Sequence, residues 1–180
     1  MKKLLFTIFI LTATISLNAQ KFFTKNATIT FQSKGPLETI EGTNKTTTAV
    51  IDSKAGAIAF SVIVKGFVME KQLMQKHFNE NYMESDRYPK ATFTGAYTGE
   101  VIPGKEGIYN VVVKGKLTIH GVTRDIETPA TLQIASGKLL GRCVMTIKPE
   151  DYNIKIPTVV RDKIAKEVSL NIQIDCTNPK

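Results

Sequence analysis

The chain contains few histidines and cysteines, two residue types that often perform catalysis or bind metals. Among its 180 residues there are two histidines, His77 and His120, and two cysteines, Cys143 and Cys176. A zinc site commonly uses three or four such ligands at a regular spacing, and neither HExxH nor CxxC occurs. The nucleophile elbow GxSxG, the phosphate-binding P-loop and the dinucleotide fingerprint GxGxxG are missing too. The sequence nominates no catalytic residue, metal ligand or required cofactor, and we predict a protein that is not an enzyme.

Two histidines each have an aspartate nearby in the sequence, which raises the alternative of acid/base chemistry. Asp86 follows His77, and Asp125 follows His120. A general acid and its partner must lie within hydrogen-bonding reach of one another. Polar contacts within a helix or a turn use the same residue types at the same spacing. We favour this second interpretation for both pairs.

The two cysteines occupy apolar-face positions of two predicted strands. If these strands pair antiparallel with Ile147 opposite Ile172, then Cys143 lies directly opposite Cys176, since both pairs of numbers have the same sum. An oxidising compartment would then favour a disulfide between them. The alternative is a pair of buried thiols that pack as small hydrophobic side chains. The sequence leaves both alternatives open.

Alternating apolar and polar residues predict that most of the chain forms strands. In the segment 111–119, Val113 and Leu117 belong to an apolar face, whereas Lys114 and Lys116 belong to a polar one. Turn signals rich in glycine and proline separate such segments, and we count about eight strands. An antiparallel barrel of eight strands can hold one small ligand. The predicted strand segments are 29–31, 46–51, 58–64, 91–97, 111–119, 126–134, 143–147 and 168–175.

One segment has the periodicity of a helix. Apolar residues at Met69, Leu73, Met74, Phe78 and Tyr82 form a single stripe. We predict a short helix here that closes one end of the barrel. Methionine side chains are flexible and can adapt to the shape of a bound ligand.

The first residues of the chain have the pattern of a signal peptide. Lys2 and Lys3 precede an apolar stretch over 4–17, and Ala19 follows it. This stretch is shorter than the roughly 20 residues that a helix needs to cross a bilayer. We predict a signal peptide over residues 1–19, a single domain over 20–180, and a periplasmic or secreted protein.

The charge distribution argues against two classes of partner. Removing both leader lysines lowers the formal charge from +8 to +6 (24 − 2 − 16), and the remaining basic residues are interspersed with acidic ones. A nucleic-acid-binding protein would cluster them in a stripe or patch. A barrel in an outer membrane would turn its apolar face outward, and an internal helix with short strands favours a barrel without stable membrane insertion. The sequence does not decide whether the protein forms a homodimer.

Three blocks of sequence resemble those of the YceI-like family. The block GKLTIHGVT at 115–123 resembles the family pattern G-x-L-T-x-H-G-V-T. The block at 85–93 ends like the family's Y-P-x-A-x-F, and the block at 149–154 resembles R-x-D-[FY]-G-I, with Pro149 near the family's Arg and Asn153 at its Gly. The resemblance implies a lipocalin-like barrel with a long hydrophobic tunnel that holds an isoprenoid or a similar lipid.

A long apolar tail can be held in such a barrel without catalysis, because each methylene moved out of water gains about 0.8 kcal/mol. We therefore predict an exported binding protein that sequesters or carries an isoprenoid or similar long-chain lipid. The alternatives are an exported enzyme acting on a lipid precursor and a stress-related interaction module that uses its outer surface. The residues predicted to face the lipid are Phe60, Val62, Leu73, Met74, Phe78, Val113, Leu117, Ile119, Met145, Ile147, Leu170 and Ile172.

Overall fold

The computed structural model describes residues 21–36, 38–102, 104–157 and 165–177. The predicted signal peptide over 1–19 lies outside these ranges. None of the helices within them is long and apolar enough to cross a bilayer.

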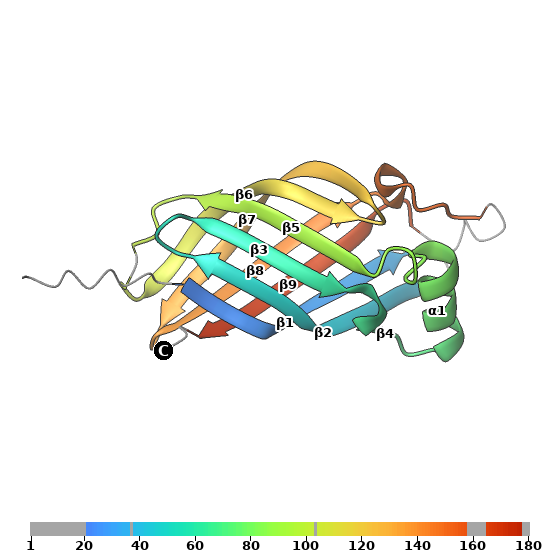
Figure 1. The fold of residues 1–180 in the computed structure, drawn as a ribbon, viewed down its shortest axis with the longest axis horizontal. Coiled ribbons are helices and arrows are strands. Elements are labelled where there is room, and N and C mark those ends of the chain that lie inside the picture. Colours follow the sequence, from blue (N-terminus) through green and yellow to red (C-terminus); the bar gives the residue numbers. More distant parts are fainter. Residues whose placement is uncertain (1–20, 37, 103, 158–164, 178–180) are drawn as a thin grey trace, which may run out of the picture.

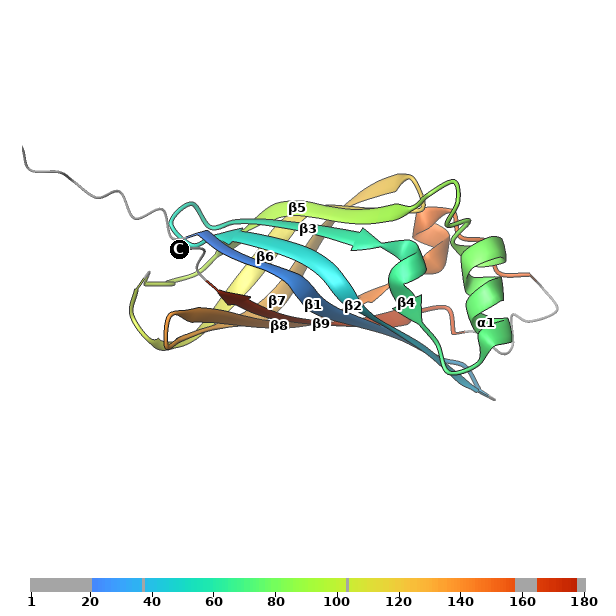
Figure 2. The same ribbon diagram turned by 60° about the horizontal axis from the view of Figure 1, so that its bottom comes forward.

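Eight antiparallel strands form a closed barrel (Figures 1 and 2). Each strand pairs with the next in the order β1-β2-β3-β5-β6-β7-β8-β9, and β9 returns to pair with β1. The two-residue strand β4 pairs with β2 outside this circuit. The predicted all-β fold with an eight-stranded barrel is therefore confirmed. The strands are β1 (Lys21–Lys34), β2 (Thr39–Asp52), β3 (Ala57–Ile63), β4 (Phe67–Val68), β5 (Lys90–Thr98), β6 (Gly107–Ile119), β7 (Val122–Ala135), β8 (Lys138–Ile147) and β9 (Val168–Thr177).

The barrel forms because the apolar face of each strand turns inward. On β6, Val111 is buried, whereas Lys114 and Lys116 are exposed on the other face. These two lysines form ion pairs with Glu127 and Asp125 on the neighbouring strand β7, both at 3.0 Å. The alternation in the sequence thus matches a wall whose apolar side faces the interior and whose charged side faces outward.

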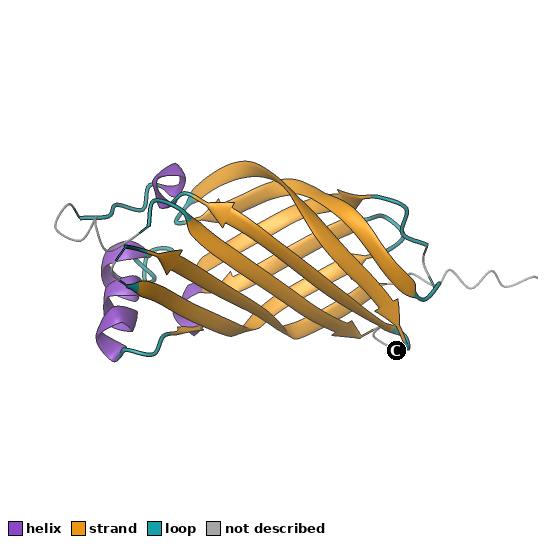
Figure 3. Ribbon diagram, turned by 180° about the vertical axis from the view of Figure 1, so that it is seen from behind, coloured by secondary structure: helices purple, strands orange, loops and turns teal. Residues whose placement is uncertain are grey.

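A helical segment lies across one end of the barrel (Figure 3). It consists of the α-helix α1 (Gln72–His77), followed directly by a π-helical stretch over Phe78–Tyr82. Met74, Phe78 and Tyr82 recur every four residues and line the barrel interior. Leu73 precedes Met74 by one residue and therefore points elsewhere on the helix, with 66% of its surface exposed. The structure therefore places Leu73, which was predicted to face the lipid, outside the cavity lining.

The opposite end of the barrel is filled by the protein's own side chains. Ile51, Leu139 and Cys176 have no exposed surface and belong to one continuous hydrophobic cluster. The hydroxyl of Tyr97 donates a hydrogen bond to the backbone carbonyl of Ser53 across 3.1 Å. Burial, together with the nearby charge of Asp52, raises the pKa of Tyr97. This end therefore forms the core that holds the strands together.

A short 3₁₀-helix covers the wall where β7 and β8 stop pairing. These two strands pair only from Ala130 opposite Cys143 to Ala135 opposite Lys138. Beyond the end of β8, the 3₁₀-helix over Pro149–Tyr152 lies against the β6–β7 hairpin. Two side chains of the hairpin bond to its backbone: Arg124 donates its Nε–H to the carbonyl of Asp151 across 2.9 Å, and the Nδ1 atom of His120 lies 3.2 Å from the carbonyl of Tyr152.

The register of β8 and β9 excludes the disulfide that the sequence left open. Cys143 lies opposite Ile172, and Cys176 lies opposite Leu139. The two cysteines are thus displaced by four residues, about 13 Å along the strands, whereas a disulfide needs Cα atoms within roughly 7 Å. Both cysteines are free. The connection over 148–167 is too long to fix a register, so the sequence could not supply the pairing that the prediction assumed.

Candidate functional site

An apolar cavity of about 390 Å³ occupies the half of the barrel beneath the helix. This volume lies within the range of roughly 300–1,000 Å³ that is typical of small-molecule sites. All eight barrel strands and the helical segment contribute to its lining. The barrel interior is therefore only partly filled by protein side chains.

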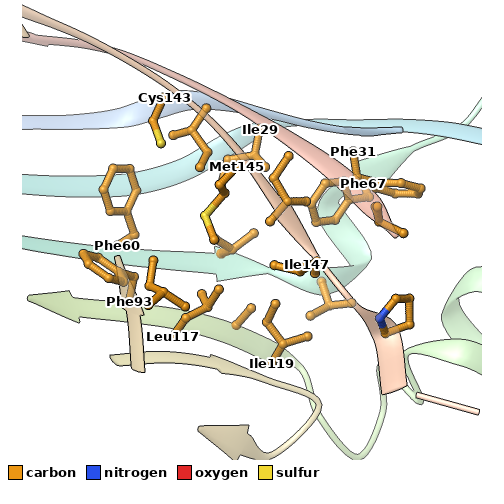
Figure 4. A pocket seen from close by; sticks show the side chains of 18 of the residues that line it. Ile29, Phe31, Phe60, Phe67, Phe93, Leu117, Ile119, Cys143, Met145 and Ile147 are labelled. Carbon is orange, nitrogen blue, oxygen red and sulfur yellow. The ribbon is translucent and has the colours of Figure 1, made fainter. Parts of the chain in front are cut away.

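Eleven of the twelve residues predicted to face a lipid line this cavity, and Leu73 is the exception. They come from β3, the helical segment, β6, β8 and β9, and their side chains share the inward parity of their strands or the inner face of the helix. Figure 4 shows that Leu117, Met145 and Ile147 point into a common space. The eleven are Phe60, Val62, Met74, Phe78, Val113, Leu117, Ile119, Met145, Ile147, Leu170 and Ile172.

Several lining residues were not among those predicted, although alternation places some of them inside. Phe93 lies on the inward face of β5, and Ile29 and Phe31 lie on the inward face of β1. The same two-residue period that identified Phe60 could have identified these three. Phe67 belongs to β4, a strand of two residues that is too short for a periodic pattern. Met69 belongs to the predicted helical stripe, although α1 begins only at Gln72.

Three phenylalanines from different elements pack together at the end of the cavity beneath the helix, which we call the mouth. The rings of Phe31 and Phe78 stack with centroids 5.1 Å apart, and Phe67 packs edge-on against both at 5.5 and 5.7 Å. Phe31 can occupy this place because its neighbour on β2 is Gly42: a Cβ atom there would lie 2.5 Å from the Phe31 ring. The cluster joins the helical segment to the barrel rim.

Hydrogen bonds from Gln75 reinforce this attachment. Its Nε2 group donates to the carbonyl of Phe67 across 3.1 Å, and its Oε1 atom accepts the backbone N–H of Met69 across 3.2 Å. Both partners lie beside β4, so a single side chain of α1 fixes the helix to the chain that leads into it. The helix is therefore held by specific contacts at the mouth.

The polar residues of the lining gather mainly at the mouth. The carboxylate of Glu38 accepts a hydrogen bond from the Nζ atom of Lys71 across 2.6 Å, and this bond raises the pKa of Lys71. His77 is exposed yet lines the cavity, and the amide of Asn81 lies 2.9 Å from its Nδ1 atom. Burial raises the pKa of Tyr82. Glu38 and His77 thus place polar side chains at the mouth.

A family model described as a YceI-like domain matches residues 12–176. The chain belongs to the YceI-like family. The predicted family membership is thus confirmed, and the barrel with its helical cap is the fold of this YceI-like domain.

Solved structures share the fold of this YceI-like chain at low sequence identity. Burkholderia cenocepacia BcnA has a TM-score of 0.71 at 21% identity, and the match covers 84% of this chain and 96% of that one. A polyisoprenoid binding domain from Saccharophagus degradans, implicated in plant cell wall breakdown, has a TM-score of 0.73 at 16% identity, covering 89% and 99%. The Campylobacter jejuni YceI protein has a TM-score of 0.58 at 18% identity, covering 99% and 94%. Among curated proteins, no match was found.

Two polar groups meet inside the apolar part of the cavity. The hydroxyl of Thr128 lies 3.7 Å from the Sγ atom of Cys143, and both residues line the cavity. Burial raises the pKa of the Cys143 thiol, and the hydrogen bond with Thr128 offsets part of this effect. Cys143 is therefore a neutral thiol and contributes a small, weakly polar surface to the wall.

The aspartates considered for acid/base chemistry pair with lysines and not with the histidines. Asp86 bonds to Lys65 at 2.6 Å, and Asp125 bonds to Lys116 at 3.0 Å. His120 instead lies with its Nε2 atom 3.2 Å from the carboxylate of Glu84. Within the described ranges, no cluster of three or more His, Cys, Asp or Glu side chains could hold a metal ion. The acid/base alternative for these two pairs is therefore wrong.

Proposed function

We propose that this YceI-like protein binds an isoprenoid or a similar long-chain lipid in its cavity and sequesters or carries it without catalysis. The observation that carries the proposal is the apolar cavity of about 390 Å³ that lies beneath the helix. Each methylene group transferred from water into such a space contributes about 0.8 kcal/mol. The structural similarity to a protein described as a polyisoprenoid binding domain supports the same ligand class.

We further propose that the protein acts outside the cytoplasm, in the periplasm or after secretion, without stable membrane insertion. The leader pattern over residues 1–19 supports export. Mass spectrometry of the mature protein tests this, because cleavage after Ala19 would leave Gln20 as the first residue. Size-exclusion chromatography with light scattering would separate a monomer from the homodimer that the sequence leaves open.

Native purification followed by lipid extraction and mass spectrometry tests the binding function. We expect an apolar lipid to co-purify with the wild-type protein. The variant Leu117→Arg places a charge in the lining and should lose that lipid, whereas Val144→Arg places the same charge on an outward position that is 62% exposed and should retain it.

A second variant keeps the test decisive if Leu117→Arg does not fold, which circular dichroism would show. Leu117→Trp fills part of the cavity without adding a charge, and it should reduce the lipid retained per mole of folded protein. Full lipid retention in a folded Leu117→Arg variant, or a wild-type protein from which no lipid can be extracted or rebound, would contradict the proposal.

A further inference from the structure

The cavity ends inside the barrel on a layer of side chains, which we call the floor. Ile51, Ile58, Leu132 and Ile174 line the cavity and also belong to the hydrophobic cluster of the opposite end. All four are buried, with exposed fractions between 0% and 7%. They therefore form the boundary between the open and the filled halves of the barrel.

Within the described ranges, buried side chains of the same cluster lie behind the floor. Seven buried cluster members do not line the cavity, and each is at most 8% exposed. The hydrogen bond between Tyr97 and Ser53 fixes the largest of these side chains in place. These residues are Phe22, Ala27, Ala49, Tyr97, Val111, Leu139 and Cys176.

Glycines let large side chains of the floor region cross the barrel. A Cβ atom on Gly141 would lie 2.6 Å from the side chain of Ile174 and 3.2 Å from that of Leu132, so both side chains extend over this glycine. In the same way, the Phe93 ring extends over Gly95 and Gly115, 2.8 Å from a Cβ atom on either. The floor is thus closely packed, and the cavity could extend past it only if one of these side chains were replaced by a smaller one.

The aromatic residues mark the two ends of the cavity. Figure 4 shows Phe60 and Phe93 at one end, and Phe31 and Phe67 at the other, with Met145 between them. The rings of Phe60 and Phe93 lie 6.3 Å apart, and Phe93 belongs to the cluster that includes the floor. A ligand that enters past Phe31 and Phe67 therefore advances toward Phe60 and Phe93.

The depth of the cavity follows from the strand that lines it from mouth to floor. On β9, the lining residues run from Val168 to Ile174, about 20 Å along the strand. With the usual barrel tilt of roughly 40°, this corresponds to about 15 Å along the barrel axis. Carbon–carbon bonds of roughly 1.5 Å at tetrahedral angles advance about 1.25 Å each, so the cavity accommodates about twelve carbons of an extended chain.

We propose that the cavity is closed at the floor and limits ligand length, so that it accepts a single apolar chain of about twelve carbons. An acyl chain of that length or about three isoprene units would fill it, with the polar head group at the mouth near Glu38 and His77. The carbons of a longer polyisoprenoid would remain outside. This inference rests on the proposed lipid-binding function and adds the size of the ligand, with Ile174 and Leu132 as the residues that set it.

A chain-length series tests the limit. The delipidated protein is titrated with straight-chain fatty acids of about eight to about twenty carbons, below their critical micelle concentrations, and affinity is measured by displacement of a fluorescent fatty acid. Affinity should rise about fourfold per carbon, the equivalent of about 0.8 kcal/mol per methylene. The rise should stop at about twelve carbons, because further carbons stay in water.

Matched variants move the limit in opposite directions. We call the chain length at which the affinity stops rising the break. Ile174→Ala removes three carbons from the floor, so the break should move to a chain longer by roughly three carbons. Ala130→Leu adds bulk to the lining two residues from Leu132 and should move the break to shorter chains. Ile172→Ala changes the wall of the same strand β9 and should weaken binding without moving the break.

Each outcome distinguishes this inference from the function on which it rests. If no fatty acid or prenol binds the wild-type protein, the lipid-binding function itself fails. If affinity keeps rising to the longest chain, or if the break stays in place in folded Ile174→Ala and Ala130→Leu variants, the protein binds lipid and the length limit is wrong.

Discussion

At the scale of single residues, Gly42 shows how one missing side chain shapes the mouth. An alanine Cβ there would lie 2.5 Å from the Phe31 ring and 3.2 Å from Met69. We therefore expect Gly42→Ala to displace Phe31 from its stack with Phe78 and to lower the free energy of unfolding by about 1–3 kcal/mol. Urea denaturation followed by circular dichroism measures this change.

The matched control for that substitution is Gly107→Ala. Gly107 also lies in a strand, and the nearest atom to its added Cβ is the Tyr109 hydroxyl oxygen at 3.3 Å, the end of a side chain that can move. We expect an effect within about 0.5 kcal/mol for this surface substitution. Equal stabilities of the Gly42→Ala and Gly107→Ala variants would show that Phe31 does not depend on the glycine.

The buried thiol of Cys176 gives the protein a specific response to alkaline pH. Burial raises the pKa of Cys176 from its ordinary value of 9.0 to about 12. A group whose pKa is higher in the folded state contributes stability that is complete below its unfolded pKa and is lost as pH rises toward its folded pKa. We expect the free energy of unfolding to fall between about pH 9 and pH 12.

The variant Cys176→Ala isolates this contribution from those of the buried tyrosines. Tyr97 and Tyr152, whose pKa values burial also raises, add to the alkaline loss in both proteins. The variant should be less stable at neutral pH, because it leaves a small cavity, but should lose less stability between pH 9 and pH 12. Parallel pH profiles for the two proteins would refute the assignment to Cys176.

At the scale of elements, the helical segment is the part of the barrel best placed to control ligand exchange. It is joined to the rim by the phenylalanine cluster and by Gln75. We expect Phe78→Ala to loosen this attachment and to accelerate dissociation of a bound fatty acid by roughly tenfold, equivalent to about 1.4 kcal/mol. Stopped-flow fluorescence measures the rate.

Leu73→Ala is the control for the helix. It removes a large apolar side chain from the same segment, but from a position that is 66% exposed and does not line the cavity. Its dissociation rate should match that of the wild-type protein. If both variants accelerate release equally, the phenylalanine cluster does not govern exchange, since Leu73 is not part of it.

The elements also show where sequence patterns stop being informative. In β1 the pattern predicted only 29–31, whereas the strand spans Lys21–Lys34. Irregular pairing between Thr24 and Ile29 shifts the alternation within the strand, and a bulge of this kind reverses the face that later residues occupy. The helix was predicted by its stripe, but its first turn, and hence the direction of Leu73, depends on where the chain leaves β4.

At the scale of the whole molecule, the sequence predicted which side chains point inward but not which half of the interior stays open. Inward parity is a local property of each strand, so it is the same for Leu117, which lines the open cavity, and for Val111 on the same strand, which is buried in the filled half. Whether an inward side chain meets another one depends on strand register and tilt around the barrel. The length of the β8–β9 connection leaves that register free, which explains why the sequence left the pairing of the two cysteines open.

A lipid that binds only the folded barrel must also stabilise the molecule as a whole. A ligand at one hundred times its dissociation constant adds about 2.7 kcal/mol to the free energy of unfolding. For a domain of this size, that corresponds to a rise in Tm of roughly 5–10 °C. We expect this rise when the delipidated protein receives a fatty acid of about twelve carbons, measured by differential scanning calorimetry.

The same measurement separates binding inside the cavity from association with the outer surface. Val144 points outward, so Val144→Arg should leave the rise in Tm intact. Leu117 lines the cavity, so a folded Leu117→Arg variant should show almost no rise. A surface-bound lipid would stabilise both variants alike. Because stabilisation requires preferential binding to the folded state, a wild-type protein that binds fatty acid with no change in Tm would show no preference for the folded barrel and would contradict binding in the cavity.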